Sequence, residues 1–130
     1  MAKLTKKIES QIRDLGLALK LQLDFAAAAD MTKPADQMTL AQNNMRAGII
    51  MIDLIKALNI TAADDAGIMD AIVAYAEKNG SDAAKVLKLQ VPKVRAINKA
   101  TADLLAERTA EHQAFTGADM NNIFRKHLAP

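Results

Sequence analysis

Residues 15–29 read LGLALKLQLDFAAAA, and the spacing of their apolar side chains decides whether the fold is all-α or contains a strand. Large apolar residues occupy every second position from Leu15 to Phe25, which is the period of a half-buried strand. However, the stretch contains no β-branched residue, and its Leu, Ala, Lys and Gln residues are strong helix formers. We therefore expect a helix over about residues 4–29 and an all-α fold.

Two apolar stripes run along this expected helix. The longer stripe has apolar residues spaced by three and four and consists of Leu4, Ile8, Ile12, Leu15, Leu19, Leu23 and Ala26. A second stripe, formed by Leu17, Leu21 and Phe25, lies about a third of a turn or more away. A helix that is apolar on two sides lies either at the centre of its domain or against another subunit. We favour the second arrangement in a chain this short, and we expect a homo-oligomer with Leu17, Leu21 and Phe25 in its interface.

Further helices are expected over residues 37–58, 62–78, 82–88, 92–112 and 119–127. Thr39 and Gln42 have the spacing of a capping box, as do Thr61 and Asp64 before the next helix. One face of the 37–58 helix consists of Met38, Ala41, Met45, Ile49, Ile52 and Ile55, and Ile50, Met51, Leu54 and Leu58 widen it. Core packing is the simplest interpretation of this face, although stripes rich in Met can also form binding surfaces.

Length and composition favour a single helical domain. The chain has 130 residues, of which 51% are hydrophobic but only 3% aromatic, so aliphatic side chains and seven Met must build the core. With three Pro and five Gly, the chain suits a bundle of five or six helices better than many short strands. We expect oligomerisation and packing helices in residues 1–58, DNA-binding helices in 61–113, and a short helix and tail in 114–130.

Several kinds of site have no support in the sequence. The absence of Cys excludes disulfides, thiol nucleophiles and zinc sites of the cysteine kind. His112 and His127 have no third ligand at metal-site spacing, and glycine-rich phosphate loops are absent. No apolar run approaches the roughly 18–20 residues that cross a bilayer. We expect a cytoplasmic, non-enzymatic protein with no cofactor, metal, small-molecule substrate or membrane partner.

The charges are unevenly distributed along the chain, although the formal net charge is only +2. Residues 53–82 contain six acids and two lysines, whereas the window that follows contains five basic residues and no acid: Lys85, Lys88, Lys93, Arg95 and Lys99. One interpretation is charge matching within the chain or between subunits. The other is a surface for a phosphate backbone, whose neutralisation releases condensed counterions.

Residues 80–98, GSDAAKVLKLQVPKVRAIN, resemble the helix-turn-helix of DNA-binding proteins. Ala84 stands where that family needs a small residue, the family's apolar positions fall on Leu87, Leu89, Val94 and Ile97, and Pro92 lies near the start of the second helix. The resemblance implies a turn at residues 88–90, where Lys88 replaces the glycine that the family favours. It also implies groove-facing positions at Gln90, Val91, Arg95, Ala96 and Lys99, and phosphate contacts from Lys85, Lys88 and Lys93. Plain helix packing with a solvated basic face is the alternative.

Two functions follow from these patterns. The first is an oligomeric helical protein that binds duplex DNA, of the kind found among small regulators or the DNA-recognition subunits of viral packaging motors. The second is a helical structural or interaction subunit of a larger protein assembly with no nucleic-acid role. The sequence favours the first, because the acid-free window coincides with the expected two-helix corner.

Overall fold

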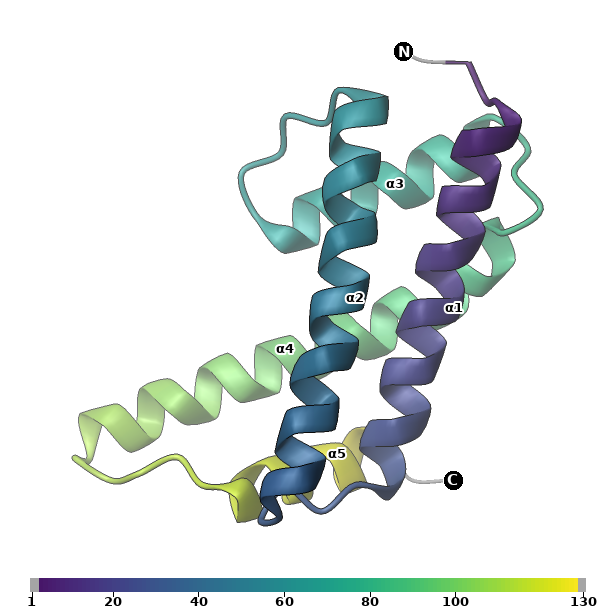
Figure 1. The fold of residues 1–130 in the computed structure, drawn as a ribbon. Helices are drawn as coiled ribbons and strands as arrows, with labels where there is room; N and C mark the ends of the chain where they lie inside the picture. The colour runs from purple at the N-terminus through teal and green to yellow at the C-terminus, as the bar shows by residue number, and fades with distance from the viewer. Residues whose placement is uncertain (1–2, 129–130) are drawn as a thin grey trace.

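The computed structural model describes residues 3–128, which form five α-helices and no strand (Figure 1). The stretch at residues 15–28 is helical throughout, so its prediction as a helix is confirmed, and the all-α bundle with it. The helices are α1 (Lys6–Ala28), α2 (Pro34–Leu58), α3 (Asp65–Lys78), α4 (Ala84–Ala110) and α5 (Gly117–Leu128).

Helix α1 lies at the centre of the packing. Its first turn is capped by Thr5, whose Oγ1 accepts a hydrogen bond from the Ile8 backbone N–H at 3.1 Å. The helix contacts α2, α4 and α5. Its buried face contains the longer stripe expected from the sequence, including Ile12, Leu15 and Leu19, which are at most 2% exposed. The leucine alternation therefore spreads apolar side chains around a helix instead of placing them on one face of a strand.

Helix α2 runs beside α1 and crosses in front of α4 in the view of Figure 1. It starts at Pro34, three residues before the expected start at 37, because proline is well suited to the first turn of a helix. The capping box expected at Thr39 is wrong. Thr39 lies within α2 and not at its N-terminus, and its hydroxyl donates a hydrogen bond to the Ala35 carbonyl at 3.0 Å. Asn59, with a φ of 53°, ends the helix in the left-handed conformation that Asn tolerates.

Helices α3 and α4 are joined by a short corner. Asp64 caps α3 by accepting a hydrogen bond from the Gly67 backbone N–H at 2.8 Å, so the helix starts at residue 65 and the expected Thr61 box is wrong. After α3, residues 79–83 turn the chain, with Gly80 at a φ of 69° and Ser81 accepting from the Ala83 backbone N–H. Helix α4 then begins at Ala84.

The turn expected at residues 88–90 is wrong. Residues 84–110 form one helix, in which the separate 82–88 and 92–112 helices of the sequence analysis are joined. Pro92 lies inside this helix with its ring exposed to solvent, and it removes the hydrogen bond that an N–H at this position would donate to the Lys88 carbonyl. Lys88, Leu89 and Gln90 are good helix formers, and without a glycine among them nothing favours a left-handed turn.

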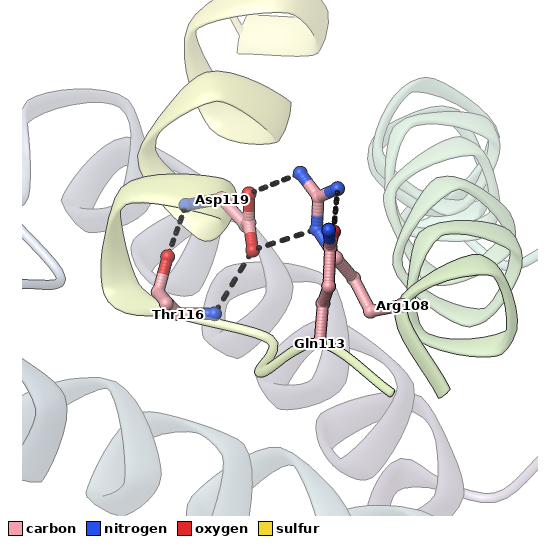
Figure 2. A network of polar contacts seen from close by, with 4 residues as sticks. All are labelled: Arg108, Gln113, Thr116 and Asp119. Carbon is pink, nitrogen blue, oxygen red and sulfur yellow. Dashed lines mark hydrogen bonds and ion pairs between the residues drawn. The ribbon is translucent and has the colours of Figure 1, made fainter. Parts of the chain in front are cut away.

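Helix α5 closes the bundle against α1 and α4. Its start is joined to the end of α4 by a network around Asp119, which accepts hydrogen bonds from Arg108 and from the Thr116 backbone N–H (Figure 2). The Thr116 hydroxyl in turn accepts from the Asp119 backbone N–H, and Gln113 accepts from Arg108. This carboxylate therefore fixes the position of the α4–α5 connection.

The other side of α5 contacts the connector between α1 and α2. The side chain of Asn121 accepts a hydrogen bond from the Met31 backbone N–H at 2.7 Å and donates to Asp30 at 2.9 Å. Arg125 donates to the backbone carbonyls of Ala26 and Ala29 at the end of α1. These bonds satisfy carbonyl groups that have no partner within the helix.

Candidate functional site

The five basic residues of the acid-free window are all exposed along α4. Two of them pair with α3: Arg95 with Asp70, and Lys88 with Glu77 at 3.6 Å. Both acids belong to the acidic segment at residues 53–82. Charge matching within the chain therefore accounts for these two basic residues.

Lys99 has an acidic partner on its own helix. Its Nζ lies 2.8 Å from Oδ2 of Asp103, and the hydrogen bond to this carboxylate, followed by its charge, raises the pKa of Lys99. Among the described residues, Lys85 and Lys93 form no salt bridge. The pairs formed by Lys88, Arg95 and Lys99 are exposed, and surface pairs of this kind contribute only about 0–1 kcal/mol each.

The continuous α4 changes which residues of the expected nucleic-acid surface are accessible. Gln90 and Val91 are buried, each 5% exposed, so the groove-facing position that the resemblance implies for them does not fit this structure. They lie three and four residues from Leu87 and Val94, and therefore on the same inward face of one helix. Ala96 is half-buried. Leu89 was assigned to a core position, but it is 60% exposed and lies among the basic residues.

The oligomer interface expected on α1 is solvent-exposed in the single chain. Leu17 is 54% and Leu21 46% exposed, while Phe25 is half-buried against the core. The two leucines line an open groove together with Asp14 of α1 and with Arg46 and Ile50 of α2. The second stripe on α1 therefore remains uncovered by the other helices.

A larger apolar surface lies on α2, where the sequence analysis favoured core packing. That interpretation is wrong for four side chains that are 51–66% exposed: Met38, Met45, Ile49 and Ile52, which we call the α2 outer stripe. The side chains of α2 that are fully buried are Ala47, Leu54 and Leu58, on the opposite side. The two apolar faces of this helix could not be ranked from spacing alone, because both have helical periodicity.

A small cavity lies between α1, α2, α4 and α5. Its walls are mainly apolar, from Leu23, Leu40 and Phe124 among others, and its volume is about 180 Å³. Gln22 and Asn44 are hydrogen-bonded to each other at its edge. Ligand pockets are typically about 300–1,000 Å³, so this cavity is small for a substrate site.

Over residues 3–128, no group of three or more His, Asp or Glu side chains is arranged to hold a metal ion. In the same range, no helix has the length and hydropathy needed to span a bilayer.

In comparisons with known proteins, no family model, curated protein or solved structure matches the chain.

Proposed function

We propose that this protein is a non-enzymatic helical subunit that acts by assembling with further copies of itself. The observation that carries the proposal is the α2 outer stripe, whose four large side chains are more than half exposed on one helix. Single exposed apolar side chains are common, but several on the same face are typical of interaction surfaces.

The energetics of burial support this choice over the nucleic-acid interpretation. Covering a large aliphatic side chain is worth about 1.5–3 kcal/mol when burial is complete. The ion pairs of the acid-free window are exposed and individually weak, and two of its basic residues already have partners on α3. Burial against a partner would therefore release the most free energy at the apolar surface of α2, and Leu17 and Leu21 of α1 would add a second contribution.

Sedimentation equilibrium over a range of micromolar concentrations tests the proposal. We expect a mass of at least twice 14.0 kDa, reached progressively as the concentration increases. A monomeric mass at every concentration would contradict self-assembly. The helical content should not change with concentration, because the fold of the single chain already buries its own core.

Duplex DNA is a second candidate partner. The observation that favours it is that the five basic residues of the acid-free window all lie on the solvent side of α4, with Lys85 and Lys93 forming no salt bridge within the described range. Exposed ion pairs can be displaced by a phosphate backbone, whose binding is driven by counterion release. The acid-free window is thus still available for electrostatic binding, although without the turn that the family resemblance implied.

Fluorescence anisotropy with a labelled duplex at two salt concentrations tests this candidate. Binding should be detectable at low salt and weaken steeply as salt is added. The double change Lys85→Glu and Lys93→Glu should abolish it. The matched control is Lys20→Glu with Lys33→Glu, which alters the net charge equally at exposed sites away from α4. Equal losses in both double variants would indicate a response to net charge and would contradict a site on α4.

A further inference from the structure

The α2 outer stripe is flanked by charges on one side only. At 100° per residue, Met45, Ile49 and Ile52 fall within an arc of about 60°, and Arg46 and Asp53 both lie about 70–90° to one side of the middle of that arc. The opposite flank carries uncharged residues, including Asn44 and Met51. Arg46 and Asp53 are both exposed, and neither forms a salt bridge with any other described residue.

These two opposite charges cannot pair within one chain. They are seven residues apart, which corresponds to about 10 Å along a helix. If a second α2 lies antiparallel against the first, however, the charged flanks of the two helices lie on the same side of the contact. The Arg46 side chain of each copy is then within reach of Asp53 in the other, so the pair forms twice. In a parallel arrangement, each charged flank would face the uncharged flank instead.

The shapes of the side chains fit the same register. An antiparallel pair centred between Gly48 and Ile49 places Met45 of each copy opposite Ile52 of the other, and brings the two copies of Ile49 together near the two-fold axis. A Cβ built on Gly48 would have no atom within 4 Å, so the space beside this residue is open in the single chain. The centre of the contact is therefore apolar, and no bulky side chain at Gly48 keeps the two helices apart.

We propose that two copies of this chain pair antiparallel along α2, with Met45, Ile49 and Ile52 at the centre and reciprocal Arg46–Asp53 ion pairs on one flank. The inference rests on the proposed function, since it specifies which face assembles and with what. It also revises the interface expected from the sequence, which lay on Leu17, Leu21 and Phe25 of α1.

Charge reversal tests the ion pairs without disturbing the core, because both residues are exposed. Arg46→Glu alone should weaken dimerisation about tenfold, since it replaces two attractions with two repulsions, and Asp53→Arg should do the same. The double variant Arg46→Glu with Asp53→Arg should restore the wild-type dissociation constant to within about threefold. Failure of the double variant to recover would overturn the antiparallel pairing.

Disulfide cross-linking tests the register, since the natural chain contains no Cys. Ile49→Cys lies near the two-fold axis and should form a cross-linked dimer on mild oxidation. Met38→Cys should not, because the two copies of residue 38 would be about 30 Å apart along the helices, far beyond the reach of a disulfide. Cross-linking at both positions would indicate a parallel pair and would overturn the inference.

Separate outcomes distinguish this inference from the proposed function. Ile49→Glu should give a folded monomer, whereas the matched control Leu89→Glu, at a site of similar exposure on α4, should leave the mass unchanged. If Ile49→Glu remains oligomeric while Leu17→Glu dissociates, the interface lies on α1: the inference fails and self-assembly stands. If the wild-type protein is monomeric throughout, both fail.

Discussion

Arg108 of α4 donates two hydrogen bonds to the Asp119 carboxylate of α5, with Nη2 3.0 Å from Oδ1 and Nε 3.4 Å from Oδ2. The same carboxylate accepts from the Thr116 backbone N–H at 3.0 Å. The hydrogen bond to Arg108, followed by that from the Thr116 backbone, lowers the pKa of Asp119. Bidentate pairing of this kind is the strongest geometry available to an arginine and a carboxylate.

The first prediction is that Asp119→Ala destabilises the protein and loosens α5. The change leaves the Arg108 guanidinium without its anion and the Thr116 N–H without its acceptor. The melting temperature should decrease, and amide exchange should accelerate more in α5 than in α1. Asp24→Ala is the control, because Asp24 makes only an exposed pair with Lys20 and should change stability by no more than about 0.5 kcal/mol. Equal effects of the two changes would contradict the prediction.

The second prediction concerns acid stability and Asp30. Hydrogen bonds from the Thr32 side chain, from Asn121 and from the Thr32 backbone lower the pKa of Asp30 to about 2, from 3.8. A carboxyl whose folded pKa is lowered stabilises the protein above its unfolded pKa, and this contribution is lost as the pH falls from about 3.8 towards 2. Melting curves between pH 5 and pH 2 should therefore show stability decreasing with acid. Asp30→Asn should flatten that decrease, and an unchanged slope would contradict the assignment.

The third prediction is that Tyr75→Phe does not destabilise the fold. The Tyr75 side chain is 2% exposed, and its hydroxyl is buried without a hydrogen-bond partner; burial also raises its pKa. An unpaired buried polar group costs about 1–3 kcal/mol, so its removal should leave the free energy of unfolding unchanged or increase it. Urea denaturation measures the difference. A loss of more than about 1 kcal/mol would show that the hydroxyl has a partner, such as a buried water.

The fourth prediction compares two glycines in helices. A Cβ at Gly117 would lie 2.1 Å from the Met31 carbonyl oxygen, so α5 and the α1–α2 connector approach too closely for any side chain there. Gly117→Ala should destabilise the protein by about 1–3 kcal/mol. Gly48→Ala, which meets no atom within 4 Å, should stabilise α2 by up to about 1 kcal/mol in the dilute protein. Thermal unfolding of both variants at low concentration provides the comparison.

Local propensity was sufficient to predict that these segments are helical. The contacts between the helices depend on tertiary packing, which propensity does not describe. The absence of β-branched residues between 15 and 29 correctly outweighed the leucine alternation, because propensity acts within the segment itself. The turn expected at 88–90 is wrong because Pro92 does not end the helix: burial of Leu87, Val91 and Val94 along one face outweighs the lost hydrogen bond and the crowding between the proline ring and the Lys88 carbonyl.

The candidate surfaces were predicted only in part. The exposure of Leu17 and Leu21 could be expected from the two apolar stripes on one helix, because the neighbouring helices of a small bundle cover only part of the circumference of its central helix. The choice between the two faces of α2 depended on where α1 lies, which no local pattern contains. The pairing of Arg95 with Asp70 likewise depended on the packing of α3 against α4. The charge counts along the chain indicated that the acidic segment and the acid-free window could form ion pairs, but they did not indicate which residues would pair.

The bonds from α5 to the α1–α2 connector have a consequence for the order of folding. Arg125 lies 96–99 residues from the carbonyls that it satisfies, and Asn121 lies 90 residues from Met31. On a ribosome, α1 and α2 emerge long before these partners, so the end of α1 stays hydrated while most of the chain is made. The contacts of α1 with α4 and α5 can therefore form only after these C-terminal helices have been synthesised, so the packing around α1 is completed by the last part of the chain to emerge.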